Sequence, residues 1–71
     1  MSNLGHHRDW TVLKLIEWSG QYLDEKGVER GRLDAEHLLA HAMSTSRLDL
    51  YLQYDRLLSG AELDQYRPLL T

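Results

Sequence analysis

Hydrophobic residues recur at three- and four-residue spacing along the first third of the chain, which predicts a helix from about residue 10 or 11 to residue 26. The expected buried face contains Val12, Leu15, Ile16, Ser19, Tyr22 and Leu23. Asp9 and Thr11 are both candidate N-caps, because either side-chain oxygen can accept a hydrogen bond from an amide at the helix start. Gly20 is expected to allow a neighbouring element to approach closely, and Gly27 signals the helix end.

A second helix is predicted over residues 32–43. Its expected buried stripe consists of Ala35, Leu38, Leu39 and Ala42. Ser46 then caps a short third helix, and Asp49 completes a capping box of the Ser-x-x-acid type. The alternation of apolar residues over 48–54 also fits a strand. Because no other segment offers a partner strand, and a lone strand leaves its backbone groups unpaired, we prefer the helix.

The end of the chain predicts a fourth helix. Ser59 and Glu62 form a second capping box, which opens this helix. The helix is expected to end near Leu70, because Pro68 lies late in it and should kink or end it.

Both copies of the triplet Arg-Leu-Asp, at 32–34 and 47–49, lie at predicted helix starts, where the helix dipole favours an aspartate. A repeat architecture would need more than two copies, so we interpret the triplets as helix-start signals. The pattern as a whole predicts an all-α fold, a small bundle of about four to five short helices over residues 10–71. Residues 1–9 are predicted to form a disordered N-terminal arm.

Size and charge narrow the class of protein. The chain has 71 residues and no cysteine, so we expect one small domain without disulfides or cysteine zinc sites. The net charge of −3 argues against binding to nucleic acid or a membrane surface, because both would want a basic face. No apolar run approaches the roughly 20 residues of a membrane span, and the N-terminus lacks a signal-peptide core. A cytoplasmic monomer is expected.

His37 and His41 are four residues apart, so on a helix both imidazoles lie on the same side. A metalloprotease helix would carry a glutamate directly after the first histidine, but Leu38 stands there. Asp34 lies one turn earlier, and no third ligand has an obvious place. We predict that both histidines face solvent and bind no metal, with His41 partly covered at the edge of the buried stripe.

No pattern predicts catalysis or cofactor binding by this chain. The serines cluster at helix caps, and the five glycines form no phosphate-binding loop. His6 and His7 are too few to be a complete purification tag. They are either native residues or the remnant of a tag. Trp10 and Tyr54 lie beside element ends and are predicted to be exposed contacts for a partner, with Arg56 as a third candidate. An acidic, partly aromatic surface would suit a basic partner, with charge aiding the encounter.

Residues 39–52 are similar to a helix-turn-helix motif, which leaves DNA binding as an alternative. The turn is short and lacks the usual glycine. The second helix sets Arg47 against Asp49 and Asp55, whereas a helix that reads bases needs hydrogen-bond donors. DNA binding is therefore the less favoured alternative.

A set of short segments occurs in order along the chain, and RLDAEHLLAH at residues 32–41 is the most specific of them. The others are Thr11-Val12 with Leu15 and Trp18, Tyr22-Leu23, Lys26-Gly27-Val28-Glu29, Ser46-Arg47, Asp55-Arg56 and the helix at Glu62-Leu63. Together they resemble the N-terminal domain of the HemK (PrmC) family, the release-factor glutamine methyltransferases. The likeness covers about residues 11–70. Three positions depart from the family pattern, and Arg30-Gly31 stands where Ser-Pro is common, so the second helix should start less firmly.

The resemblance implies a parent enzyme that methylates the glutamine of the Gly-Gly-Gln motif in release factors. The family's catalytic domain binds S-adenosylmethionine through an Asp-x-Gly-x-Gly loop and holds the glutamine with Asn-Pro-Pro-Tyr, and neither motif occurs here. The chain is therefore expected to be an isolated, non-catalytic N-terminal domain that helps position the release factor. Its expected partners are the release factor and its own C-terminal methyltransferase domain. A stand-alone helical adaptor is the competing interpretation.

Overall fold

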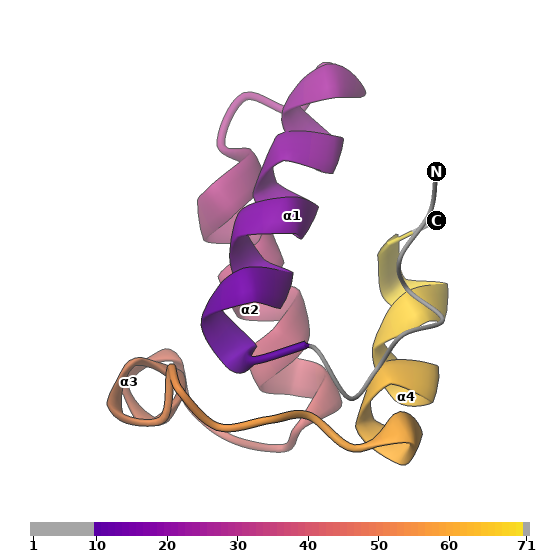
Figure 1. Cartoon of the computed structure of the whole chain (residues 1–71). Helices are drawn as coiled ribbons and strands as arrows, with labels where there is room; N and C mark the ends of the chain where they lie inside the picture. Colours follow the sequence, from indigo (N-terminus) through magenta and orange to yellow (C-terminus); the bar gives the residue numbers. More distant parts are fainter. Residues whose placement is uncertain (1–9, 71) are drawn as a thin grey trace.

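The structure, a computed structural model, describes residues 10–70. These residues form four helices and no strand, which confirms the all-α prediction. The helices are α1 (Val12–Glu25), α2 (Gly31–Ala42), α3 (Arg47–Leu52) and α4 (Gly60–Leu70). Helix α1 packs along α2, α4 packs on α2 from one side, and α3 projects on the other side (Figure 1). The predicted N-terminal arm, with His6, His7 and the candidate cap Asp9, lies outside the described residues.

Helix α1 begins and ends where local signals place it. The Thr11 hydroxyl is the N-cap and accepts a hydrogen bond of 3.1 Å from the amide of Lys14. Gly27 follows the C-cap residue Lys26 and adopts a φ of +91°, a backbone conformation that residues other than glycine rarely adopt. Both ends therefore follow from residues within or beside the helix.

The connection between α3 and α4 crosses the start of α1. The first two amides of α1 donate hydrogen bonds of 3.0 and 3.1 Å to the carbonyls of Arg56 and Tyr54. The amide of Leu58 donates in turn to the carbonyl of Trp10, at 2.8 Å. Amides at a helix start have no partner inside the helix, so this crossing satisfies groups that would otherwise need water. It also holds the crossing connection, residues 53–58, against residues 10–13 near the start of the chain.

Helices α1 and α2 touch through two glycines. A Cβ atom at Gly20 would lie 3.0 Å from the Cα of Arg32, and one at Gly31 would lie 2.4 Å from the carbonyl oxygen of Gly20. The predicted close approach at Gly20 is thereby confirmed. The start of α2 has no cap from its own N-cap residue, Arg30. Instead the carboxylate of Asp24, from α1, accepts a hydrogen bond of 3.2 Å from the amide of Gly31.

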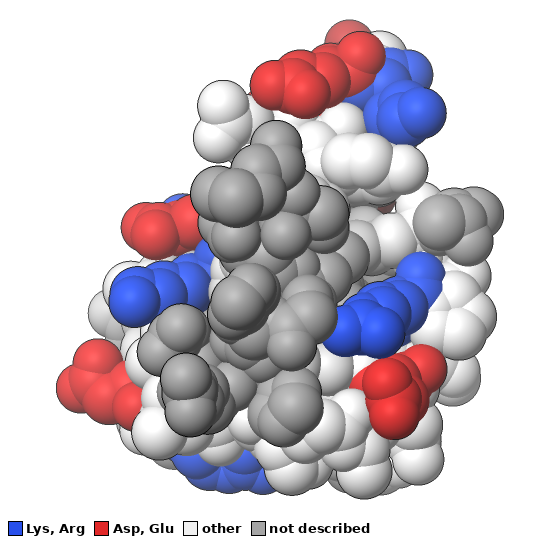
Figure 2. Space-filling view, turned by 45° about the vertical axis from the view of Figure 1, so that its right-hand side comes forward, with Lys and Arg blue, Asp and Glu red and all other residues white. Residues whose placement is uncertain are grey.

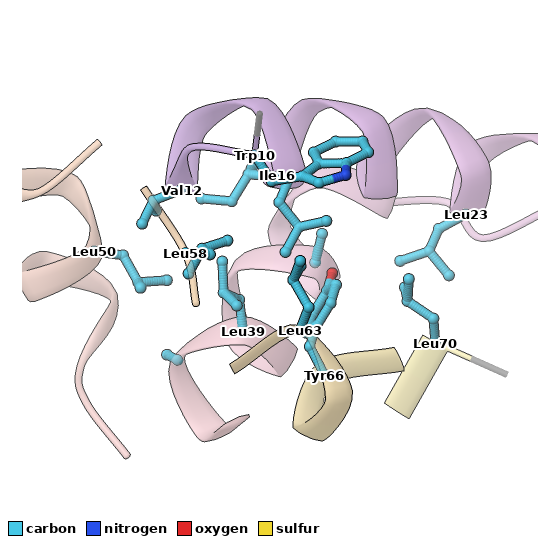
Figure 3. Close-up of a cluster of buried hydrophobic side chains, with 13 residues drawn as sticks. Trp10, Val12, Ile16, Leu23, Leu39, Leu50, Leu58, Leu63, Tyr66 and Leu70 are labelled. Carbon is cyan, nitrogen blue, oxygen red and sulfur yellow. The ribbon is translucent and has the colours of Figure 1, made fainter. Parts of the chain in front are cut away.

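The core forms between α1, α2 and α4, and Figure 3 shows its side chains converging. It contains Trp10, Val12, Leu15, Ile16, Leu23, Ala35, Leu39, Ala40, Leu50, Leu58, Leu63, Tyr66 and Leu70. The predicted stripe on α2 is partly wrong, because Leu38 and Ala42 are only half-buried and Ala40 is buried instead. Helix α2 contacts three other helices, so its buried surface extends around the helix beyond a single stripe.

Tyr66 lies fully buried, with its hydroxyl pointing from α4 towards α1 (Figure 3). Burial raises its pKa to about 12, and the nearby hydroxyl of Ser19 offsets only part of this rise. Neither hydroxyl makes a hydrogen bond of normal geometry to a described residue. Helix α4 opens with the predicted capping box, through the reciprocal hydrogen bonds of 2.9 and 3.1 Å between Ser59 and Glu62. It extends to Leu70, the last described residue, with Pro68 inside the helix.

Residues 47–52 form a helix, so the strand alternative is wrong. The one bridge of β type in the described part of the chain joins Thr11 and Leu57 and lies outside α3. Ser46 caps α3 and accepts a hydrogen bond of 3.1 Å from the amide of Asp49. The second half of the predicted capping box is missing, because the carboxylate of Asp49 accepts from the hydroxyl of Thr45 at 2.9 Å.

Candidate interaction surface

Trp10, predicted to be an exposed partner contact, is instead a core residue with 7% of its surface exposed. Its ring packs edge-on against Trp18, with ring centres 6.1 Å apart. The hydrogen bond from Leu58 to its carbonyl ties the residue beneath the crossing connection. The prediction failed because its burial depends on a segment almost fifty positions away, between residues 10 and 58.

Arg56 is exposed but is occupied within the chain. Its guanidinium binds the carboxylate of Glu62 through both nitrogens, with one contact of 3.0 Å, and also donates to the carbonyl of Leu57. Hydrogen bonding to Arg56 lowers the pKa of Glu62 to about 2. Arg56 therefore links the crossing connection to α4. Among the described residues, its side-chain hydrogen bonds go to Leu57 and Glu62 and not to Tyr54.

Tyr54 is half-buried and belongs to a polar cluster that sequence reasoning missed. Its hydroxyl accepts a hydrogen bond of 3.4 Å from Arg32, on α2. Arg32 also contacts the carboxylate of Glu36 at 3.2 Å, and Arg47 contacts the other oxygen of Glu36 at 2.8 Å. Burial would raise the pKa of Glu36, but the hydrogen bonds from Arg47 and Arg32 outweigh it and lower this pKa below its usual value. Three parts of the chain thus meet around one carboxylate.

Beside this cluster, α3 exposes large apolar side chains. Leu48 is 67% exposed, Tyr51 64% and Leu52 73%. We name these three residues the α3 face. An open pocket of about 450 Å³ adjoins the face, and its lining consists of Glu36, Arg47, Leu48, Tyr51 and Tyr54. The segment RLDLYL was the signal in the sequence that could have indicated this face. A helix of six residues is too short to bury all four of its apolar side chains.

His37 and His41 are both exposed on α2. The solvent-facing orientation is confirmed, while the partial covering predicted for His41 is wrong. The covering fails because Leu38 and Ala42, the residues of the predicted stripe nearest to His41, are themselves only half-buried. Within residues 10–70, no group of three or more His, Cys, Asp or Glu side chains is arranged to hold a metal ion. The absence of metal binding stays a prediction.

The charge of the described residues is mixed on one face. Around the grey area of Figure 2, basic and acidic side chains are interspersed, and no broad basic area is visible. Helix α3, which would be the recognition helix of a helix-turn-helix, has six residues and exposes Leu48, Tyr51 and Leu52, with Arg47 as its one basic residue. None of the helices in the described range is long and apolar enough to cross a bilayer.

Comparison with known proteins places this fold in a family. Residues 14–71 match the model of the PrmC N-terminal domain. The chain is 43% identical over 60 residues to a release factor glutamine methyltransferase of Geobacter sulfurreducens, covering 84% of the chain and 21% of that relative. It is 38% identical over 69 residues to the enzyme of the same name from Rhodopirellula baltica, covering 97% of the chain and 23% of the relative.

The chain therefore spans less than a quarter of the length of these relatives. No solved structure gives a significant match. The family match covers most of the chain, and the relatives agree with it in name. This chain belongs to the PrmC N-terminal domain family.

Proposed function

We propose that this chain is the N-terminal domain of a cytoplasmic release factor glutamine methyltransferase and that it helps to bind and position the release factor. The observation that carries the proposal is the similarity of most of the chain to relatives bearing this enzyme name. On this proposal, the parent enzyme methylates the side-chain amide nitrogen of the glutamine in the Gly-Gly-Gln motif. Correct orientation of such a large substrate contributes strongly to rate, which gives a separate binding domain its use.

S-adenosylmethionine is the methyl donor expected for such an enzyme. One open pocket of about 460 Å³ is lined by six charged residues together with Gly31 and Leu33. Small-molecule sites are usually concave and mostly apolar, with a few placed polar groups. We therefore propose that another part of the parent enzyme binds this cofactor, and that the present chain is not catalytic by itself.

A domain exchange tests the proposed function. This chain would replace the matching segment of the Geobacter sulfurreducens enzyme, and methylation of that organism's release factor would be followed by mass spectrometry of the glutamine peptide. We expect the chimera to methylate the release factor with a kcat/KM near that of the parent. An unrelated helical domain of equal length, placed at the same position, serves as the control and is expected to lower kcat/KM.

A stand-alone helical adaptor is the competing function, and the same exchange separates the two. An adaptor for an unrelated partner would give a chimera no more efficient than the control with the unrelated domain. That result, obtained with a chimera whose helical content and S-adenosylmethionine binding are intact, would contradict the proposed function.

A further inference from the structure

We infer that the α3 face and its adjoining pocket form the surface through which this chain docks the release factor. The inference rests on the proposed function and names the surface that performs it. The matching element on the release factor is an apolar segment that carries a carboxylate at its edge. Four structural observations support this assignment.

The first observation is an excess of apolar side chains in α3 over what the fold uses. Of the four apolar residues in this six-residue helix, only Leu50 is buried. The described residues contain four large exposed hydrophobic side chains, three of which are the α3 face and the fourth of which is Leu57. Scattered single exposures are ordinary, whereas a contiguous apolar patch on a small domain marks an interaction site.

The second observation is that contacts within the chain already order the side chains that line the pocket. The ring of Tyr51 packs edge-on against that of Tyr54, with ring centres 5.1 Å apart. The hydroxyl of Tyr54 accepts a hydrogen bond from Arg32, and Arg47 is held by two hydrogen bonds to Glu36. A wall that is already ordered loses less conformational entropy on binding than a mobile one.

The third observation is that two guanidinium groups share one carboxylate beside the pocket. Arg32 and Arg47 both bind the carboxylate of Glu36, so these three side chains together carry one positive charge, with the exposed Asp49 on the same helix as Arg47. The side chain of Arg47 lines the pocket and is 46% exposed, so its remaining donors can meet a second carboxylate. Complementary charge beside an apolar contact sets the register of a complex.

The fourth observation is the position of α3 in the molecule. In the proposed parent enzyme, the remainder of the protein follows this N-terminal domain. Helix α4 ends at Leu70 on the opposite side of the molecule from α3 (Figure 1). A domain that follows α4 would therefore join the chain at a point remote from the α3 face.

Resonance mapping tests the surface directly and detects weak binding. The 71-residue chain, labelled with nitrogen-15, would be titrated with the Geobacter sulfurreducens release factor, and the amide resonances would be followed. We expect the largest changes at Leu48, Tyr51 and Leu52, with smaller ones at Arg47 and Tyr54. Changes centred elsewhere, for example around Trp18 and Tyr22 of α1, would overturn the inference.

Matched variants test the chemistry of the contact. The double variant Leu48→Ser/Leu52→Ser is expected to weaken binding at least tenfold, and Arg47→Gln several-fold, while the melting temperature stays close to that of the wild type. The controls are Leu57→Ser, a leucine outside α3 that is 57% exposed, and Lys14→Gln, an exposed charge on α1. Both controls are expected to bind as the wild type does. Equal losses in Leu57→Ser and in the double variant would overturn the inference.

The remaining outcomes separate this inference from the proposed function. If the domain-exchange chimera is active and Leu48→Ser/Leu52→Ser leaves its KM for the release factor unchanged, the docking surface lies elsewhere and the function stands. If the chimera is inactive and the chain shows no resonance changes, the function and the inference both fall. Sedimentation that reveals a dimer, abolished by Leu48→Ser/Leu52→Ser, would assign the α3 face to self-association and overturn the inference.

Discussion

At the scale of single residues, the ion pair between Arg56 and Glu62 joins the crossing connection to the start of α4. Glu62 also accepts a hydrogen bond of 2.9 Å from the amide of Ser59, which completes its capping box. These contacts favour the ionised carboxylate, and they lower the pKa of Glu62 from 4.5 to about 2. The side chain is therefore linked both to local helix capping and to the stability of the fold in acid.

Glu62→Gln is expected to lower the free energy of unfolding by about 0.5–1 kcal/mol at pH 7, because both partners are partly exposed and only the ion pair is lost. Glutamine can still take part in the capping box. The pKa is depressed on folding, so the contribution is present above about 4.5, the unfolded value, and is lost as pH falls towards about 2. Urea unfolding at pH 7 and pH 2.5 measures the difference.

The control for this prediction is Asp64→Asn, since Asp64 makes only a longer contact of 3.7 Å with Arg67 on the same helix. It is expected to change stability less than Glu62→Gln does at pH 7. A Glu62→Gln effect that is as large at pH 2.5 as at pH 7 would show that the ion pair is not its cause.

The two histidines of α2 give a second prediction at the same scale. Both are exposed, so His37→Ala and His41→Ala should each change the free energy of unfolding by less than about 0.5 kcal/mol. Added zinc should leave the melting temperature of the wild type unchanged, because the described residues provide no third ligand arranged with them. A melting temperature that rises with zinc in the wild type, but not in His37→Ala, would establish a metal site.

At the scale of elements, the contact between α1 and α2 depends on backbone proximity at Gly20 and Gly31 and on one carboxylate. The departure Arg30-Gly31 from the family pattern weakens local capping of α2, as expected, because Arg30 makes no side-chain cap. Asp24 supplies a cap from the neighbouring helix. The close approach of the two helices requires a glycine at position 31, and it also brings the carboxylate of Asp24 within hydrogen-bond distance of the amide of Gly31.

Asp24→Ala is expected to lower the free energy of unfolding by about 1 kcal/mol, the usual effect of losing a helix cap. Asp24→Asn should retain most of the stability, since an amide oxygen can accept the same hydrogen bond. Glu25→Ala is the control, because Glu25 is an exposed neighbour on the same helix. Thermal melts of the three variants are the measurement, and equal losses in Asp24→Ala and Glu25→Ala would contradict the capping role.

Gly31→Ala should destabilise the chain by about 1–3 kcal/mol, because its Cβ would lie 2.4 Å from a backbone oxygen that cannot move freely. Gly20→Ala should cost less, because its closest approach is 3.0 Å and alanine favours the middle of a helix by about 1 kcal/mol. Denaturant unfolding of the two variants gives the order. A smaller loss for Gly31→Ala than for Gly20→Ala would mean that the helices separate readily.

At the scale of the whole molecule, a chain of 71 residues draws its stability from one small core, with a total of about 3–5 kcal/mol expected. Trp10 lies in that core, where its ring packs on Trp18 of α1 and its carbonyl accepts a hydrogen bond from Leu58 of the crossing connection. The α3 face, by contrast, lies on the outside of the core. The residues that stabilise the core are thus different from those of the proposed docking surface.

Trp10→Ala should remove about 3–5 kcal/mol, comparable to the whole stability, and leave most of the chain unfolded at 25 °C. Leu52→Ala should change stability by less than about 0.5 kcal/mol, because the side chain is 73% exposed. Circular dichroism at 222 nm, with a urea titration, compares the two. A well-folded Trp10→Ala variant would show that the core does not depend on the Trp10 side chain.

The sequence by itself determined the helices, their order and most of their ends. The Thr11 cap, the Ser59 and Glu62 box and the stop at Gly27 rest on contacts within three or four residues, and the spacing of apolar residues reports directly which side of α1 is buried. The ordered set of segments also sufficed to indicate the family. These inferences succeeded because their causes are local.

Tertiary structure alone decided the features that involve distant segments. The burial of Trp10, the cap that Asp24 supplies to α2, and the meeting of Arg32, Arg47 and Tyr54 around Glu36 each depend on residues brought together only by packing. The exposed α3 face is likewise a property of the assembled bundle. Hydrophobic burial is not directional, so the pattern of α3 specifies that four side chains are apolar, and only the packed neighbours determine which of them is covered.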